Sequence, residues 1–234
     1  MAPYDIIGNI ALVKFMRGAS AREKKRYATQ LLKGNRSVTT VLEKTGKISG
    51  RLRTPETKFI LGEDTKEALY RENGCEFRLN IDTCYFSPRL ASERKEIASM
   101  VKRKERVLVM FGGVAPFAIV IGKSKKAKEI VSVELGKVPS KYALDNVKRN
   151  KLLEIVKVIQ GDVRKVVPKL SKIGKFNRIV MSRPNLEDSF LDVAFKAIAK
   201  NGIIHYYGFY EEAKLQDMKE LIAKEAKKAK KKAG

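Results

Sequence analysis

The sequence predicts an α/β protein in which a small α+β module precedes a larger domain built on a parallel β-sheet. From about residue 90 onward, five short apolar segments alternate with segments of helical periodicity. This alternation is typical of a parallel sheet covered by helices on both faces. Before residue 84 the pattern differs, because several short β-rich segments follow a single helix. The predicted parts span residues 1–83, 84–210 and 211–234, the last being a basic C-terminal segment.

In the first part, the mostly apolar residues 6–15 predict one β-strand. Ser20 can cap a following helix that runs to about Leu32, and Glu23 completes a capping box with it. The pair Asn73-Gly74 is typical of a hairpin turn between two strands. We expect the later strands of this part at residues 37–42, 57–61, 66–71 and 76–81.

In the second part, the five apolar segments are short enough to be buried strands, and helical segments separate them. We expect these strands at residues 106–111, 129–134, 155–159, 178–181 and 202–207. We expect helices at residues 92–102, 140–150 and 187–199, one between the first two strands and one from residue 162. In such sheets ligands bind at the carboxyl ends of the strands, so site residues should follow the strands directly.

The charge balance favours a nucleic-acid partner. Lys and Arg number 50 against 26 Asp and Glu, so the formal net charge is +24. Such an excess attracts polyanions through counterion release and steering. The alternatives are solubility or a basic tail alone. Removing the eight lysines between Lys214 and Lys232 still leaves a strong excess, so the body of the protein is basic as well.

Other features of the composition exclude several classes of protein. The two cysteines, Cys75 and Cys84, do not form a metal-ligand pattern, and the chain has one histidine, so we expect no metal site. No stretch approaches 18 apolar residues and no signal peptide is evident, which predicts a cytoplasmic protein with no membrane span. The lysine-rich end at 211–234 predicts a helix that is either a solvated end or an RNA-contacting tail.

Three successive strand ends carry candidate cofactor-binding residues. The first strand leads into Phe111-Gly112-Gly113-Val114-Ala115, a glycine-containing turn that a cofactor can approach closely. Glu134 ends the second strand, where an acid can accept two hydrogen bonds from a ribose diol, although a surface glutamate is the alternative. Asp162 follows the third strand and either accepts from an adenine amino group or caps a helix. Together they favour an adenosine-containing cofactor.

Four segments resemble the archaeal and eukaryotic tRNA (guanine-37 N1)-methyltransferase family, whose superfamily includes the wybutosine-pathway aminocarboxypropyltransferase. These are residues 85–94 (YFSPRLASER), 110–117 (MFGGVAPF), 145–152 (DNVKRNKL) and 203–207 (IIHYY). The resemblance implies a Rossmann-like class I methyltransferase domain, dependent on S-adenosylmethionine (SAM), behind a small RNA-binding module. It further implies a tRNA partner, and we expect a monomer.

The resemblance assigns catalytic roles to three residues. Glu93 matches the general base that takes the proton from guanine N1 as that atom attacks the methyl carbon. Arg53 matches an arginine that stabilises negative charge on guanine O6. Arg89 matches an arginine near the catalytic pocket and the amino-acid end of the cofactor. The alternatives are a helix-surface ion pair for Glu93 and phosphate contacts for the two arginines.

Further residues are expected around the substrate and the cofactor. Tyr85 and Pro184 match residues that hold the flipped base, although Tyr85 could instead belong to the core. Ser87 and Arg183 are assigned to the same substrate pocket, and Ser182 to the cofactor site. His205, which lies in an apolar strand, is expected to be structural.

The chain departs from the family pattern at several places. Val109 stands where the family has Asp at the end of the first strand, and Ala115 replaces a glycine of the cofactor loop. Ser182 stands where the family has Asn, so an amide able to both donate and accept is missing. From the resemblance we expect no counterpart here of the N-terminal tRNA-elbow domain of full-length methyltransferases or of the family's last two strands. The lack of the elbow domain is the layout of the aminocarboxypropyltransferase branch.

Three hypotheses follow from these observations. The first is SAM-dependent N1-methylation of guanosine 37 in tRNA, which the residues Arg89 and Glu93 favour. The second is transfer of the aminocarboxypropyl group of SAM to a modified guanosine in the same tRNA, which the domain layout favours. The third is a tRNA-binding protein with a degenerate cofactor site, motivated by Val109, Ala115 and Ser182.

Overall fold

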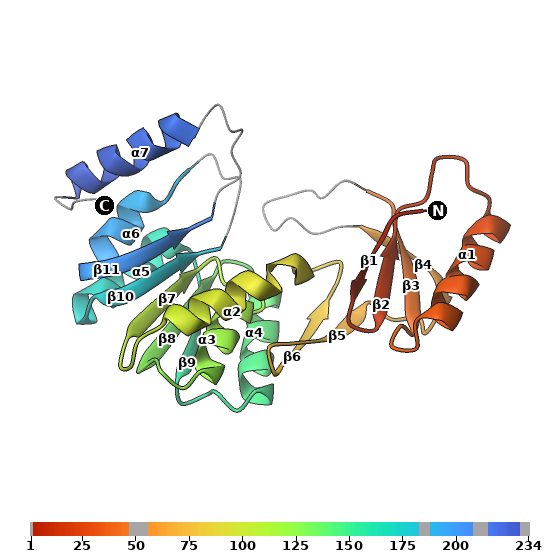
Figure 1. Ribbon diagram of the computed structural model, residues 1–234, viewed down its shortest axis with the longest axis horizontal. Coiled ribbons are helices and arrows are strands. Elements are labelled where there is room, and N and C mark those ends of the chain that lie inside the picture. The colour runs from red at the N-terminus through yellow and green to blue at the C-terminus, as the bar shows by residue number, and fades with distance from the viewer. Residues whose placement is uncertain (1, 47–55, 183–187, 208–214, 230–234) are drawn as a thin grey trace.

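The computed structural model describes residues 2–46, 56–182, 188–207 and 215–229. Two sheet-containing parts lie along the long axis of the molecule, and a two-stranded hairpin stands between them (Figure 1). The predicted fold class is confirmed, because a small α+β part precedes a domain with a parallel sheet. The boundary at residue 83 remains a prediction. None of the described helices is long and apolar enough to cross a membrane.

The N-terminal part is a four-stranded sheet with one helix on it. Its strands are β1 (Tyr4–Ile7), β2 (Ile10–Val13), β3 (Thr40–Lys44) and β4 (Thr57–Gly62), in the order β1-β2-β3-β4. Helix α1 (Ala21–Gly34) buries Ala28 and Leu31 against Val13 and Val41 of the sheet. The predicted capping box is confirmed, since the hydroxyl of Ser20 accepts from the backbone N–H of Glu23 at 3.2 Å.

The prediction of one strand over residues 6–15 was wrong. The chain turns back at Gly8, so β1 and β2 are the two arms of an antiparallel hairpin. Gly8 has φ +59°, and a Cβ there would clash with the backbone carbonyl of Leu69. The pair Gly8-Asn9 is a two-residue hairpin signal between two apolar segments, and reading residues 6–15 by their apolar composition alone missed it.

The hairpin between the two sheets consists of β5 (Glu67–Glu72) and β6 (Cys75–Asn80). Its predicted turn is confirmed, with φ +49° at Asn73 and +69° at Gly74, the left-handed pair that favours these residue types. The hairpin is anchored in the larger domain by two asparagines, Asn146 in α4 (Lys137–Arg149) and Asn150, the C-cap residue of that helix. Asn146 and Asn150 exchange hydrogen bonds of 2.7–3.0 Å with the backbone of Arg78 and Glu76 respectively.

The larger domain contains five parallel strands, as predicted. They are β7 (Arg106–Met110), β8 (Glu129–Glu134), β9 (Val156–Gln160), β10 (Phe176–Met181) and β11 (Ile198–Tyr206), in the order β11-β10-β7-β8-β9. The chain order reverses beside the central strand β7. In doubly wound sheets this switch point creates a crevice at the carboxyl ends of the strands, where ligands bind.

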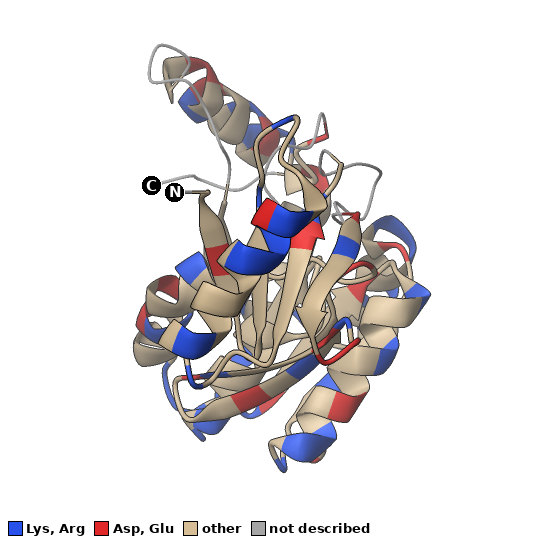
Figure 2. Ribbon diagram, turned by 90° about the vertical axis from the view of Figure 1, so that its right-hand side faces the viewer, with Lys and Arg blue, Asp and Glu red and all other residues tan. Residues whose placement is uncertain are grey.

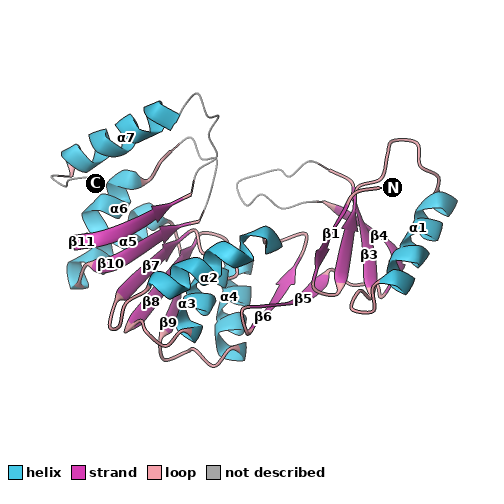
Figure 3. Cartoon of the chain, viewed as in Figure 1, coloured by secondary structure: helices cyan, strands magenta, loops and turns pink. Residues whose placement is uncertain are grey.

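Helices cover both faces of this sheet (Figure 3). Val107 and Val109 of β7 face α2 (Ala91–Met100), α3 (Pro116–Lys123) and α4, whereas Leu108 and Met110 face the other side. That side is covered by α5 (Val163–Ile173), α6 (Leu191–Ala197) and α7 (Leu215–Lys228). The expected C-terminal helix is thus confirmed, and its residues Met218 and Ala226 are buried rather than solvated.

A buried ion pair joins the hairpin to α2. Arg94 and Glu72, whose side chains are 1% and 4% exposed, form a two-bond ion pair. The same guanidinium donates to the carbonyl of Ser87 at 3.0 Å and lies over the rings of Phe86 and Phe117. Breaking a buried ion pair leaves one charge without a partner in a medium of low dielectric constant, which costs about 3–5 kcal/mol.

Glu72→Ala should therefore lower the free energy of unfolding by about 3–5 kcal/mol, because it leaves Arg94 buried without its counter-charge. The matched control is Glu76→Ala in the same hairpin, which removes exposed ion pairs to Arg71 and Arg149 and should cost less than about 1 kcal/mol. Chemical denaturation of both variants measures the difference. Equal losses would show that the buried pair does not stabilise the junction.

Candidate functional site

The predicted cofactor loop lies where β7 ends, at the centre of the parallel sheet. Between β7 and α3 the backbone is left-handed at Phe111, Gly113 and Ala115, with φ of +62°, +54° and +65°. The N–H of Gly112 donates to the carbonyl of Val133 on β8 at 2.9 Å, which holds the loop against the neighbouring strand. The loop is therefore a tight reversal that ends at the N-terminus of α3.

The two glycines of the loop serve different purposes. A Cβ at Gly112 would clash with the hydroxyl of Ser132 on β8, so any other residue there would force that buried hydroxyl to move. A Cβ at Gly113 would meet a single described atom within 4 Å, the carbonyl oxygen of Tyr85 at 3.8 Å. Gly113 thus leaves open space above the loop, which is the feature that allows close approach of a cofactor.

Glu134, at the end of β8, is 8% exposed and is not the surface glutamate that the sequence left as an alternative. Its carboxylate accepts from the backbone N–H of Gly113 at 2.8 Å and from that of Gly136 at 2.7 Å. A carboxylate has about four acceptor positions, so each oxygen can still accept one hydrogen bond. The residue fits the predicted pair of hydrogen bonds from a ribose diol, and that role remains a prediction.

Asp162 caps α5, since its carboxylate accepts from the N–H of Arg164 at 2.8 Å. The helix-cap interpretation is therefore confirmed, while the adenine contact remains a prediction for the second carboxylate oxygen. Asp162 lies next to Glu134 because the N–H of the intervening Gly161 donates to the Glu134 carbonyl at 2.8 Å. The three strand ends thus meet at one edge, and their carboxylate acceptors fit the hydroxyl and amino donors of an adenosine-containing cofactor.

Ser182 also contacts this edge. It follows β10, and its hydroxyl donates to the carbonyl of Phe111 at 3.2 Å. It therefore supports the cofactor loop, and its predicted contact with the cofactor remains a prediction. Three other expected site residues, Arg53, Arg183 and Pro184, lie outside the described residues.

The segment 84–89 lines a pocket of about 370 Å³ against the N-terminal sheet. Tyr85, 38% exposed, and Ser87 both contribute to its wall. Arg89 also lines it, but its guanidinium lies 2.9 Å from the carboxylate of Asp5 on β1. Asp5 accepts from Lys44 as well, at 2.7 Å, and these two cations hold the pKa of its carboxyl below its usual value, Lys44 more strongly. In this structure Arg89 therefore links the two parts of the protein.

Glu93 lies half-buried in the first turn of α2. It forms no ion pair with any described residue, so the helix-surface pairing that the sequence left open is not observed there. Tyr207, which follows β11, was not among the predicted site residues. Burial, and then the charges of Glu93 and Glu96, raise the pKa of Tyr207 to about 12, so its hydroxyl keeps its proton near Glu93. Its ring packs on Phe117 of α3 at 5.6 Å.

The departure at Val109 has a visible consequence in the sheet. Val109 is paired in register with Ser132, which is fully buried. The Ser132 hydroxyl has no hydrogen-bond partner among the described residues. An unsatisfied buried hydroxyl is destabilising, and an acidic side chain at position 109 would lie on the neighbouring strand beside it. The valine therefore leaves one polar group unpaired beneath the cofactor loop.

His205 is structural, as expected. Its Nε2 lies 2.6 Å from the guanidinium of Arg178, which is buried and also pairs with Glu105 at 2.8 Å. Arginine only donates, so this nitrogen accepts and the ring is neutral. Burial, and secondly the charge of Arg178, lower the pKa of His205 to about 4. This buried network was missed, and the lone Arg178 in an apolar strand was its only signal.

Asn146 was likewise missed as a site residue, although its motif was noted. Its amide donates to the carbonyl of Val114 in the cofactor loop at 3.3 Å, besides its bonds to the hairpin.

The described residues contain no group of three or more His, Cys, Asp and Glu that could hold a metal ion.

Ala115→Gly should leave the free energy of unfolding unchanged within about 1 kcal/mol, because relief of the left-handed conformation offsets the lost buried methyl. The matched control is Ala118→Gly, inside α3 and equally buried. It should lose about 2 kcal/mol, since glycine is unfavourable in a helix and the methyl is lost as well. Thermal unfolding compares the two, and equal losses would contradict the strain at Ala115.

The pH dependence of stability should carry a contribution from the single histidine. The unfolded His205 binds a proton near its ordinary pKa of 6.5, while the folded residue does so only near pH 4. The unfolded state therefore gains protons first, and stability falls as the pH drops from about 6.5 to 4. The variant His205→Gln should lose less stability across this window. Parallel slopes for both proteins would rule out the shift.

Comparison with known proteins agrees with this geometry. Residues 68–233 match the family described as the TRM5/TYW2 methyltransferase domain, and residues 2–65 match the TYW2 N-terminal domain. The tRNA (guanine(37)-N(1))-methyltransferase Trm5b of Pyrococcus abyssi is 37% identical over 213 residues, or 89% of this chain. The chain spans 60% of the length of that relative.

Two further similarities cover both parts of the chain. A tRNA(Phe) (4-demethylwyosine(37)-C(7)) aminocarboxypropyltransferase of Methanocaldococcus jannaschii is 28% identical, covering 87% of this chain and 77% of that protein. A solved complex of aTrm5 with tRNALeu is 28% identical with a TM-score of 0.82, covering 94% of this chain and 63% of that one. The predicted Rossmann-like methyltransferase fold is confirmed, and the chain belongs to the TRM5/TYW2 methyltransferase domain family.

Proposed function

We propose that this protein transfers the methyl group of SAM to N1 of guanosine 37 in tRNA. One observation carries the proposal most directly. The half-buried carboxylate of Glu93 has no ion-pair partner among the described residues. Its charge contributes to the raised pKa of Tyr207, whose ring packs on α3, the helix that starts at the cofactor loop. A carboxylate that is not neutralised by a structural cation is available as a general base.

Different residues of the chain would have different roles in this reaction. SAM supplies an electrophilic methyl group when bound. Glu134, the open face of Gly113 and Asp162 would hold its adenosine half, and Ser182 would keep the loop in place. Glu93 would take the proton that N1 loses as the N–C bond forms. Tyr85 would contact the extruded base from its partly exposed position beside Gly113.

Arg53, Arg183 and Pro184 complete the proposed substrate site by resemblance alone. Arg89 would have to exchange its bond with Asp5 for one with substrate or cofactor. The proposal further includes a cytoplasmic monomer that acts on tRNA without a metal for the chemistry. The net charge of +24 supports the choice of an RNA substrate.

A second candidate is transfer of the aminocarboxypropyl group of SAM to a modified guanosine of the same tRNA. The specific observation that favours it is the match of residues 2–65 to the TYW2 N-terminal domain. The unpaired Ser132 hydroxyl beside Val109 favours a weaker cofactor site, and with it the third candidate, a tRNA-binding protein without turnover.

The first experiment is incubation with methyl-labelled SAM and an unmodified tRNA transcript that carries G37. Label in 1-methylguanosine after nucleoside digestion is expected. Methylthioadenosine as the cofactor product, in place of S-adenosylhomocysteine, would establish the second candidate instead. Absence of both products, together with no heat of SAM binding in calorimetry, would leave tRNA binding alone.

Glu93→Gln should lower the single-turnover rate by about 100-fold or more, because the amide cannot accept the N1 proton. Binding of tRNA should stay largely intact. The matched control is Glu96→Gln, an exposed residue one turn later on the same helix, which should keep the rate. Equal rates for Glu93→Gln and the unaltered protein would exclude Glu93 as the base.

A further inference from the structure

A basic groove lies on the face of the larger domain that is covered by α5, α6 and α7. It has a volume of about 630 Å³ and is walled by α5, by α6 and by Ala229, which follows α7. Its charged lining residues are Arg164, Lys172, Lys175, Lys196 and Asp192, so four cations face one carboxylate. The proposed catalytic residues do not include any of them.

The charges are distributed unevenly along this groove. At one end Arg164 is neutralised by ion pairs to both Asp188 and Asp192. At the other end, Lys172, Lys175 and Lys196 form no ion pair with any described residue. The ammonium of Lys175 donates to the carbonyl of Lys196 at 2.7 Å, which leaves two of its protons for other partners. The unpaired positive charge therefore gathers at one end.

The lysine end lies far from the cofactor. Lys175 directly precedes β10, so it is at the amino edge of the sheet, whereas the cofactor loop follows the carboxyl end of β7. Six residues of strand separate the two edges, a length of about 20 Å. The lysines cannot contact a base held beside Gly113. A partner that contacts these lysines would therefore do so at a second place, separate from the catalytic edge.

The adjoining chain adds to the positive charge. The chain reaches the groove at Ala229, directly after α7. The last turn of α7 contains Lys227 and Lys228, of which Lys228 is paired with Glu225 at 2.6 Å, so Lys227 supplies the added charge. Lys and Arg also lie on several other helices (Figure 2), so a basic surface alone does not define a site. This groove differs because its lysines converge on one cavity.

We propose that this groove binds the phosphodiester backbone of RNA, as a second contact for the tRNA whose G37 enters the catalytic edge. Lysine ammonium groups are compact point charges that contact phosphates without reading base edges. A polyanion also neutralises several lysines at once and releases its counterions. The proposal rests on the proposed function in taking that RNA to be the enzyme's tRNA.

The test is tRNA binding by the full chain in which Lys172, Lys175 and Lys196 are all changed to Ala. Affinity for a full-length tRNA transcript, measured without cofactor, should fall on the order of tenfold, which corresponds to about 1.4 kcal/mol. The slope of log affinity against log salt should shrink by up to about 3, one for each lost phosphate contact.

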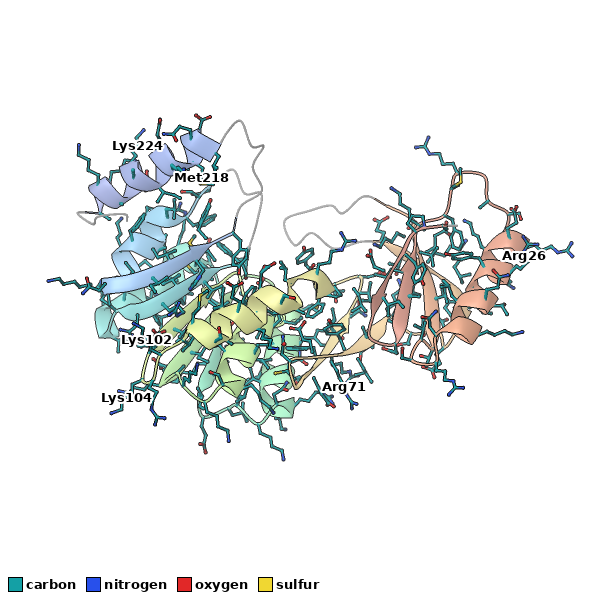
Figure 4. The ribbon with its side chains drawn as sticks, viewed as in Figure 1. Arg26, Arg71, Lys102, Lys104, Met218 and Lys224 are labelled. Carbon is teal, nitrogen blue, oxygen red and sulfur yellow. The ribbon has the colours of Figure 1, made fainter. Side chains whose placement is uncertain are left out.

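Two controls separate the groove from general charge. The triple variant Lys102→Ala, Lys104→Ala, Lys128→Ala removes three exposed lysines from the same edge of the sheet (Figure 4 labels the first two), none of which lines this groove. It should bind tRNA nearly as tightly as the unaltered protein. Changing the three groove lysines to Arg should also retain affinity, since the charge is kept.

The outcomes are distinct from those of the methylation assay. Equal losses in the groove and control variants, or an unchanged salt slope, would overturn the groove as an RNA site. At saturating tRNA the groove variant should methylate at the unaltered single-turnover rate. If the unaltered protein transfers no group at all, the proposed function fails, while the binding measurement still decides the groove.

Discussion

The architecture depends on one buried guanidinium. Arg94 draws partners from three regions: the carboxylate of Glu72 from the hairpin, the carbonyl of Ser87 from the segment before α2, and the ring of Phe117 from α3. A buried charge is tolerated only when it is paired and hydrogen-bonded, so these regions must assemble together. Glu93 is the preceding residue on the same helix. The proposed base is therefore positioned by the contacts of its neighbour, and the hairpin is joined to the domain that holds the cofactor loop.

The cofactor loop is held from several sides before any ligand arrives. Glu134 accepts from the N–H of Gly113, Asn146 donates to the carbonyl of Val114, and Ser182 donates to that of Phe111. These side chains come from β8, α4 and the end of β10. The loop backbone is already fixed in left-handed conformations, so the cofactor would not have to order it on binding. The entropy cost of binding is therefore reduced, as in a preorganised site. Asn146 also binds the hairpin, so the loop and the hairpin share a support.

The proposed catalytic carboxylates and the proposed RNA-binding lysines lie at opposite edges of the sheet. At the carboxyl edge of the sheet, three of the proposed functional side chains are the carboxylates of Glu93, Glu134 and Asp162, each suited to accept protons or hydrogen bonds. At the amino edge the lysines of the basic groove are unpaired among the described residues. A tRNA is long enough to touch both edges while a single nucleotide is extruded. Positive charge placed away from the reacting atoms can raise affinity without opposing the ionised base.

The sequence by itself determined the periodic elements, the five parallel strands, the capping box at Ser20 and the turn at Asn73-Gly74, because each depends on residues close together in the chain. It also located the cofactor loop, since ligands bind at strand ends in such sheets. The turn at Gly8-Asn9 was missed although the pair is a local hairpin signal, whereas the close contact of Gly8 with Leu69, distant in sequence, appears only in the structure. Only the tertiary structure decided the Arg94 ion pair, the bond between Arg89 and Asp5, the position of Tyr207 near Glu93 and the convergence of the groove lysines. These depend on which buried charges and open surfaces meet after packing, and local sequence does not encode that proximity.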